Sequence, residues 1–130
     1  MTSVPPAKED LDHRRPVWDA LSSLFLDTDT SLLREWRVKL LASSPYSLEQ
    51  MEHILVDEVY PICLWNLFSI AGEWAGFDMA WLERRILRRL QSPLRFLHRA
   101  NLGRVTVLLS GEWAATKHGV SVARTSREVA

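Results

Sequence analysis

The chain has 130 residues, which is the length of one domain. Sixteen basic and sixteen acidic residues give a formal net charge of zero, and 47% of the residues are hydrophobic. This composition excludes intrinsic disorder, collagen-like repeats and low complexity, and it supplies enough apolar surface for a core. The single cysteine, Cys63, excludes an internal disulfide framework and any zinc site built from several thiolates.

The chain shows no targeting signal. Residues 1–10 lack the apolar core of a signal peptide, and residues 59–72, the longest stretch without a charge, are shorter than the roughly 20 apolar residues that span a bilayer. We therefore expect a cytoplasmic protein. We expect residues 1–11 to form a flexible leader, residues 12–116 a single helical domain, and residues 117–130 a frayed or weakly helical tail.

The first two expected helices are separated by a polar turn. Pro16 suits the first turn of a helix, and the residues after it form one apolar face at helical spacing. These residues are Val17, Trp18, Ala20, Leu21, Leu24 and Phe25. Residues 27–30 predict a turn that caps the next helix, which ends at residues 43–45. Its inward residues are expected to be Leu33, Trp36, Leu40 and Leu41.

A capping box formed by Ser47 and Gln50 predicts the start of a third helix. Pro61 is expected to break or kink this helix, and the nearly all-apolar residues 62–71 belong in the centre of the core. The predicted core face of the third helix is made of Leu48, Met51, Ile54, Leu55 and Val59.

The last third of the chain also favours helices. Asp78 caps a helix that has an apolar side and a basic side. The apolar side holds Met79, Leu82, Ile86 and Leu90, and the basic side holds Arg84, Arg85, Arg88 and Arg89. Residues 94–100 and 104–109 are expected to be helical too, because a lone strand at Val105-Thr106-Val107 would have no partner. The sequence therefore predicts an all-α fold, a compact bundle of five to seven short helices.

The two ends of the chain differ in charge. Residues 1–80 hold thirteen acidic and six basic residues, and residues 81–130 hold three acidic and ten basic residues. The division is compatible with oppositely charged helices packing side by side, and also with patches that attract a charged partner. Arginine suits phosphate, but the neutral chain and the lack of a recognition motif disfavour nucleic acid.

Two sets of residues could carry chemistry. Glu49, His53 and Asp57 repeat every fourth residue, but the helical wheel places them on the solvated side, where a charge ladder is favoured over a metal site. Gly72-Glu73-Trp74-Ala75 recurs as Gly111-Glu112-Trp113-Ala114. Glu73 and Glu112 would form the acid/base pair of a small hydrolase if the fold brought them together. The favoured interpretation is that both segments pack through tryptophan, and we expect no catalytic residue, metal or cofactor.

Several blocks between residues 14 and 90 are distinctive as sequence. They are Arg15-Pro16-Val17-Trp18-Asp19-Ala20-Leu21-Ser22, Ser44-Pro45-Tyr46-Ser47-Leu48, Glu58-Val59-Tyr60-Pro61 and Ala71-Gly72-Glu73-Trp74-Ala75-Gly76-Phe77-Asp78. In these blocks the chain resembles a family of small, single-domain bacterial proteins of unknown function. The resemblance implies a bacterial, stand-alone protein and assigns no active site. A small helical protein without chemistry also resembles immunity proteins, which neutralise a partner toxin.

We therefore expect a non-enzymatic protein-binding module, an immunity protein that neutralises a toxin domain by steric and electrostatic occlusion. It would be a monomer or homodimer without membrane contact. One alternative is a regulator that binds nucleic acid or another polyanion through the arginine-rich helix, and the other is the small hydrolase. The expected partner-binding residues are Asp27, Asp29, Asp57, Glu58, Trp81, Arg84, Arg85 and Arg88.

Overall fold

The computed structural model describes residues 4–25, 30–67, 79–92 and 102–129, and these residues are arranged as helices joined by short connections. The α-helices are α1 (Leu11–Ser22), α2 (Arg34–Ala42), α3 (Leu48–Ile54), α4 (Tyr60–Leu67), α5 (Met79–Leu90) and α6 (Leu102–Val129). Short 3₁₀ turns at Ala7–Glu9, Ser23–Phe25 and Thr30–Leu33 and a π-helical segment at Leu55–Val59 complete the set. No strand occurs in these residues, so the all-α prediction is confirmed.

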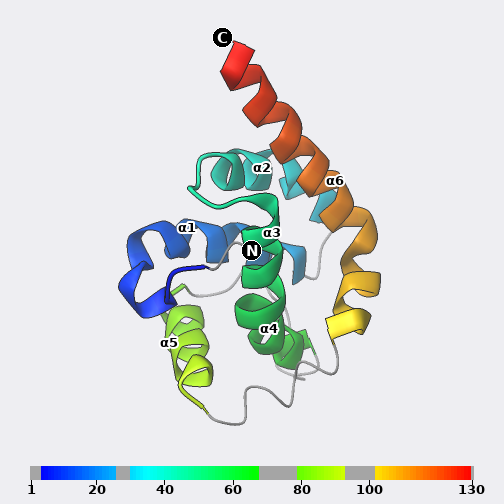
Figure 1. The fold of residues 1–130 in the computed structure, drawn as a ribbon. Coiled ribbons are helices and arrows are strands. Elements are labelled where there is room, and N and C mark those ends of the chain that lie inside the picture. Colours follow the sequence, from blue (N-terminus) through cyan, green and yellow to red (C-terminus); the bar gives the residue numbers. More distant parts are fainter. Residues whose placement is uncertain (1–3, 26–29, 68–78, 93–101, 130) are drawn as a thin grey trace.

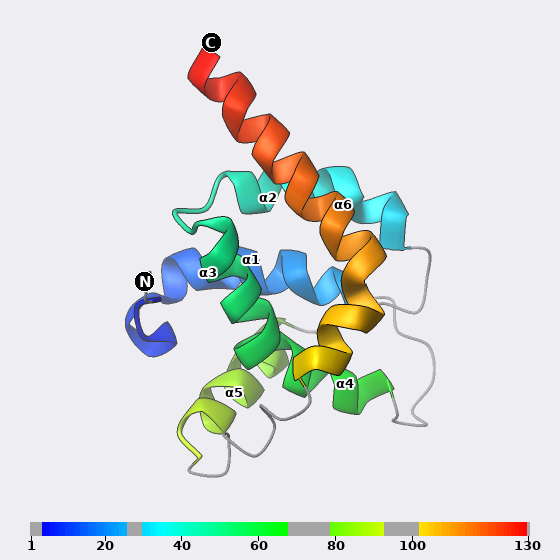
Figure 2. The ribbon, with the colours of Figure 1, turned by 45° about the vertical axis from the view of Figure 1, so that its right-hand side comes forward.

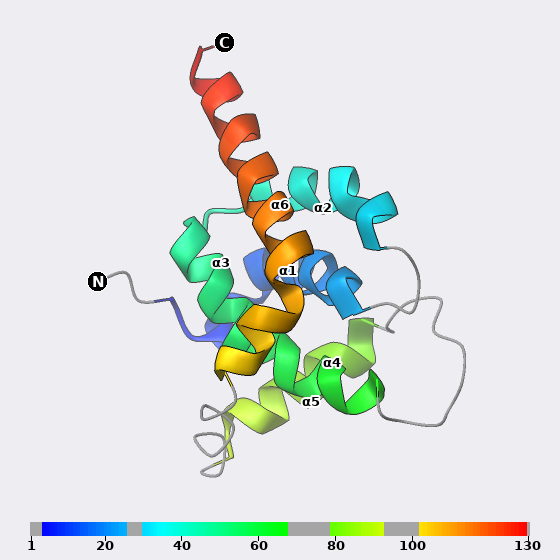
Figure 3. The same cartoon turned by 90° about the vertical axis from the view of Figure 1, so that its right-hand side faces the viewer.

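The helices pack around α1. α2 lies along one side of α1, while α3, the π-helical segment and α4 form one continuous rod that crosses α1 (Figure 1). α5 contacts both α1 and the π-helical segment. The long α6 crosses α2, and its C-terminal end projects beyond the other helices (Figure 2). In Figure 3, α1 lies between α2 on one side and α4 and α5 on the other.

The apolar faces expected from the sequence meet in the core. Trp18 of α1 and Trp113 of α6 are the largest buried side chains of the described residues. The face predicted for the third helix is buried at Met51, Ile54, Leu55 and Val59, and the face predicted for α5 is buried at Leu82 and Ile86. Cys63 is fully buried, and burial raises the pKa of its thiol, so it remains an unreactive core residue.

The capping box is present as predicted. Ser47 Oγ accepts a hydrogen bond from Gln50 N at 3.1 Å, and Gln50 Oε1 accepts one from Ser47 N at 2.8 Å. These bonds satisfy backbone donors at the start of α3 that have no partner inside the helix.

Pro16 does not lie in the first turn of its helix. The hydrogen bond from Arg14 N to Asp10 O, at 2.9 Å, already belongs to the first turn, so α1 begins at Leu11 and Pro16 is an interior residue. A proline there leaves the carbonyl of Asp12 without its helical donor. The side chain of Asp12 is fully exposed, so the missing hydrogen bond lies on the side of α1 that faces solvent.

The inward face expected for the second helix is wrong at one residue. Leu41 is fully buried, but Trp36 is 40% exposed, and Arg37 occupies the buried position beside it with an exposure of 0%. An arginine can take such a position only where its charge and its donors are matched by partners. The partners of Arg37 are Ser23, Glu112 and Thr116.

Residues 117–129, where a frayed or weakly helical tail was expected, continue α6 without a break. Arg124 explains the order of this segment, because its guanidinium donates to the carbonyls of Leu41, Ala42 and Ser44 at 3.2, 3.3 and 3.0 Å. The last carbonyls of α2 have no intrahelical donor, so Arg124 supplies what that helix end lacks. Residues 104–109, for which a strand was the alternative, are helical.

Close contact between α6 and α2 depends on Gly119. A Cβ atom added there would lie 2.7 Å from Val38 Cγ2, whereas one added at Gly111 of the same helix would meet nothing within 4 Å. The side chain of valine is short and stiff, so it has little freedom to move aside. Glycine is therefore required at the crossing and is only tolerated at residue 111.

This difference gives a matched pair of variants. We expect Gly111→Ala to raise the free energy of unfolding by about 0.5–1 kcal/mol, because alanine favours the helix. We expect Gly119→Ala to lower it, because the new methyl group overlaps Val38. Urea denaturation of both variants measures the difference, and an equal gain in both would contradict the close helix crossing.

Candidate functional site

A buried arginine, Arg14 of α1, collects partners from three parts of the chain. Its Nε and Nη2 atoms donate to the two carboxylate oxygens of Glu58 at 3.1 and 2.8 Å, and its Nη1 atom donates to Asp10 Oδ2 at 3.1 Å. Trp18 Nε1 also donates to Glu58, at 2.8 Å. Tyr46 donates its hydroxyl to Asp10 and packs its ring against the guanidinium, with Cζ of Arg14 5.4 Å from the ring centroid. We call these five residues the Arg14 cluster.

The contacts within the Arg14 cluster fix its protonation. Burial alone lowers the pKa of Arg14, but the hydrogen bonds and the charge of Glu58 outweigh burial and raise this pKa above its ordinary value. Burial and the hydrogen bond to Asp10 raise the pKa of Tyr46 to about 12. Burial also raises the pKa of Asp10, but hydrogen bonds from Tyr46 and His13 and the charge of Arg14 bring it below its ordinary value. At neutral pH the arginine is charged, the tyrosine is neutral and the aspartate is ionised.

Glu58 and its neighbour Asp57 lie within the π-helical segment, where the helix is wider than a regular α-helix. In the π-helical segment the N–H of Tyr60 donates to the carbonyl of Leu55, five residues earlier. The wider turn rotates the acidic residues away from the direction that a regular α-helix would give them. Asp57 and Glu58 are only 6% and 3% exposed, so their expected place on a solvated acidic face is wrong.

Pro61 explains a second link to this segment. Because proline has no N–H, it cannot donate to the carbonyl of Asp57, four residues earlier. Arg89 Nη1 donates to that carbonyl from α5 at 2.8 Å. Arg89 was expected on the solvent side of its helix, but it is partly buried and joins α5 to the π-helical segment.

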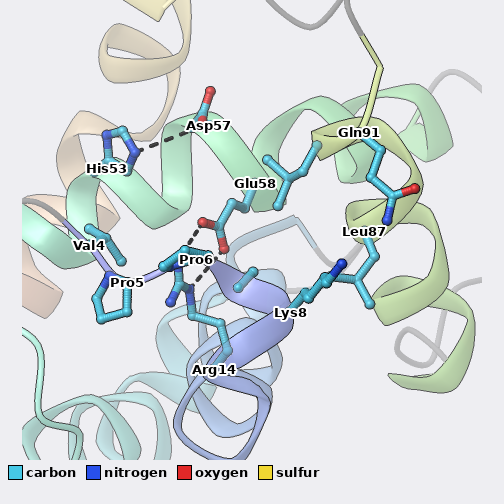
Figure 4. A pocket seen from close by; sticks show the side chains of 12 residues that line it. Val4, Pro5, Pro6, Lys8, Arg14, His53, Asp57, Glu58, Leu87 and Gln91 are labelled. Carbon is cyan, nitrogen blue, oxygen red and sulfur yellow. Dashed lines mark hydrogen bonds and ion pairs between the residues drawn. The ribbon is translucent and has the colours of Figure 1, made fainter.

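A cavity of about 260 Å³ lies beside the Arg14 cluster (Figure 4). It is lined by residues 4–8, by the π-helical segment and by the C-terminal end of α5. Glu58 points toward Arg14, whereas Asp57 points toward His53, whose Nε2 atom lies 3.8 Å from Asp57 Oδ2. Both oxygens of Glu58 accept bonds from protein donors, so this carboxylate serves as a structural anion.

The expected ladder of Glu49, His53 and Asp57 is divided by burial. Glu49 and His53 are exposed, whereas Asp57 is buried because of the π-helical turn. Among the described residues, no three side chains of the types that bind metal ions gather at one place.

A second buried arginine, Arg37 of α2, forms a comparable cluster with α6. Its Nη1 atom donates to Glu112 Oε2 at 3.0 Å and to Thr116 Oγ1 at 3.1 Å, and its Nε atom donates to Ser23 Oγ at 2.8 Å. Arg34 binds both oxygens of Glu112, at 2.7 and 2.9 Å. We call these five residues the Arg37 cluster. It fixes α6 to α2 and to the turn after α1.

Glu112 is therefore held by two arginines of α2, Arg34 and Arg37. The hydrogen bonds from Arg34 and the charges of both arginines lower the pKa of Glu112, against the opposing effect of burial. A general acid at neutral pH needs the opposite shift. Its expected counterpart, Glu73, lies outside the described residues. Trp113 beside it packs in the core and donates to Glu52 at 3.0 Å, so the second copy of the recurring segment does pack through tryptophan.

Ion pairs join the acidic part of the chain, residues 1–80, to the basic part, residues 81–130. Arg15 binds Glu83 at 2.5 Å and Arg34 binds Glu112 at 2.7 Å, and Lys117 lies 3.4 Å from Glu52. In the first two pairs the arginine comes from the acidic part and the glutamate from the basic part. These pairs therefore use the minority charge of each part and do not compensate its excess charge.

Arginines and a tryptophan form an exposed surface on α5, which we call the α5 ridge: Trp81, Arg84, Arg85 and Arg88. The three arginines are exposed, and Cζ of Arg85 lies 5.5 Å from the ring centroid of Trp81. In the part of the chain that the structure describes, Arg84 and Arg88 form no ion pair. The ridge thus holds four of the eight expected partner-binding residues. Two others, Asp57 and Glu58, are buried, and Asp27 and Asp29 lie outside the described residues.

Sequence reasoning missed the two buried arginines. Arg14 lies one turn before Trp18 on the same side of α1, and Arg37 lies one turn after Leu33 and one turn before Leu41. The sequence did contain a signal for these buried arginines. Each occupies a position that the helical period assigns to an apolar residue, and the chain has glutamates within apolar segments that could pair with them.

Fold and site together define a small all-α domain whose helices are joined by buried arginine–glutamate clusters. The chain belongs to a family described as a domain of unknown function, DUF7079, whose model matches residues 12–119. This agrees with the resemblance to an uncharacterised family. No curated protein and no solved structure matches the chain. No helix among the described residues is long and apolar enough to cross a membrane.

The Arg14 cluster can be tested by removing one charge. Glu58→Gln leaves the buried Arg14 with Asp10 as its one remaining counter-charge among the described residues, so we expect the free energy of unfolding to fall by about 3 kcal/mol. The matched control is Glu35→Gln, an exposed carboxylate on α2, for which we expect a change within about 0.5 kcal/mol. Urea denaturation measures both. A similar small change in both variants would show that Glu58 does not compensate the buried arginine.

The Arg37 cluster predicts a pH dependence. The folded-state pKa of Glu112 lies below its ordinary value of 4.5, so its contribution is fully present above that pH and is lost as the pH falls through the folded value. Glu112→Gln should cost about 2 kcal/mol at neutral pH. Its deficit relative to the wild type should shrink as the solution becomes more acidic than pH 4.5. Unfolding curves across the acid range check this, and a deficit independent of pH would contradict it.

Proposed function

We propose that this protein is a non-enzymatic protein-binding module that contacts an acidic surface of its partner through the α5 ridge. The observation that carries the proposal is a row of exposed arginines beside a tryptophan, with Arg84 and Arg88 unpaired in the described part of the chain. Tryptophan and arginine are enriched among the residues that dominate binding energy. An unpaired basic ridge also speeds the encounter with an acidic partner.

The state of the buried carboxylates supports a binding function over a hydrolytic one. Both oxygens of Glu58 accept hydrogen bonds from the buried Arg14, and the two oxygens of Glu112 accept them from Arg34 and the buried Arg37. Carboxylates held in this way join helices of the fold, and the pKa of Glu112 is lowered by its arginine partners. These carboxylates are used by the fold, so binding is proposed at the exposed surface of the domain.

We further propose that the partner is a toxin domain and that the protein is a bacterial, cytoplasmic immunity protein. The small helical fold and the charged ridge support this role, since occlusion of an active surface requires a rigid domain and an electrostatic match but no chemistry. The alternative use of the same ridge is to bind nucleic acid or another polyanion, because arginine binds phosphate through two parallel hydrogen bonds.

Charge reversal on the ridge tests the proposal. Arg84→Glu/Arg88→Glu should weaken binding to the partner by at least about tenfold, because two favourable charge contacts become repulsive. The matched control is Lys8→Glu/Lys39→Glu, which makes the same change in net charge at two exposed lysines outside α5. The three tagged proteins are used to capture partners from lysate of the native host, and the protein retained by the wild type is purified and titrated with each of them.

The outcomes separate the functions. A partner that is toxic when expressed alone, and is neutralised by the wild type and the lysine variant but not by the ridge variant, supports the immunity role. Equal affinity for all three proteins would remove the α5 ridge from the contact. Binding of labelled duplex DNA or single-stranded RNA, lost steeply with added salt, would favour the polyanion alternative.

A further inference from the structure

A groove lies between α1, α2 and the N-terminal part of α5. It has a volume of about 620 Å³ and opens to solvent. Most of its lining is apolar and comes from Pro16, Trp36, Leu40 and Met79. Three charged residues also line it: Arg15, Asp19 and Glu83.

The carboxylate of Asp19 has no hydrogen bond or ion pair within the described residues. Arg15, one turn earlier on α1, is the nearest basic residue along the helix, but it binds Glu83, with Nε 2.5 Å from Oε1. Burial raises the pKa of Asp19 above its ordinary value of 3.8, as expected for a partly buried carboxylate without a counter-charge. The groove therefore holds one unmatched negative charge.

Trp36 gives the groove an exposed aromatic wall. Its side chain is 40% exposed, which leaves a large apolar surface in water. The face of an indole ring attracts a cation, and most strongly a planar guanidinium. An indole ring and an unmatched carboxylate that line one groove both attract the guanidinium group of an arginine side chain.

We propose that this groove binds an arginine side chain carried by an apolar segment of a partner protein. The guanidinium pairs with Asp19 and stacks on Trp36, and the aliphatic stem lies along Pro16, Leu40 and Met79. An acidic ligand would meet Asp19 and Glu83 and be repelled. A purely apolar ligand would bury Asp19 further without a counter-charge, which is unfavourable.

The groove would make the proposed protein-binding function more specific. The inference rests on that proposed function in one respect, namely that the arginine belongs to a partner protein. Ala80, which also lines the groove, is one turn before Arg84 of the ridge on α5, so one partner can contact both. The groove and the ridge have opposite charges, and each is tested with its own variants and probes. Failure of one therefore leaves the other standing.

The test uses the whole chain and two short peptides. The probe is acetyl-Leu-Arg-Leu-amide, and its uncharged counterpart replaces arginine with citrulline, which has nearly the same shape. Binding is followed by NMR through the indole N–H signal of Trp36, assigned by its loss in Trp36→Phe. We expect a saturable shift with the arginine peptide, and binding at least about tenfold weaker with the citrulline peptide or with Asp19→Asn.

Two controls make the result decisive. Asp12→Asn, which removes a fully exposed carboxylate from the same helix, should leave the affinity unchanged. Asp19→Asn should be at least as stable as the wild type at neutral pH, because the raised pKa of Asp19 means that its ionised form disfavours folding there. A destabilised Asp19→Asn would reveal a structural partner and overturn the proposal. Equal binding of both peptides, or the absence of any saturable shift, would also overturn it.

Discussion

A charged arginine with almost no access to water, Arg14, is the constraint on which the arrangement of the N-terminal half depends. Removing an arginine from water is costly unless its charge and its donors are all matched. The match requires Glu58 to face α1, and Glu58 lies in the π-helical segment, whose wider turn sets the direction of its side chain. A local change in helical pitch, a buried ion pair and the packing of two helices are therefore one feature of the molecule.

The Arg37 cluster repeats this solution at the other end of α1. There the glutamate is Glu112 of α6. It lies 75 residues after Arg37 in the sequence, and α6 packs against α2. Buried pairs of this kind contribute little net stability compared with apolar residues of the same size, but a helix that shifts along its neighbour loses the pair and leaves a buried charge. The two clusters therefore act mainly on register: they select one alignment of α1, α2 and α6 among those that an apolar core would allow.

The division between what the sequence predicted and what it did not follows from the same physics. Apolar periodicity identified the buried faces of α3 and α5, and the capping box at Ser47 located a helix start, because these signals are local. The rotation at residues 55–59 and the burial of Arg37 were not predictable from a helical wheel. Each depends on a partner more than forty residues away, and a wheel with a fixed angle per residue cannot represent a π turn.

These structural charges also determine which residues face solvent. Trp36 and Arg37 are neighbours on α2 and point in directions about 100° apart, so both cannot be buried against the same surface. Because Glu112 holds Arg37 inside, Trp36 is left at the surface, beside the unpaired Asp19. In the same way, Arg89 is used by the carbonyl of Asp57, while the other arginines of α5 face outward. The exposed wall of the groove is thus a consequence of the Arg37 cluster, and the outward direction of the α5 ridge accompanies the bond between Arg89 and the π-helical segment.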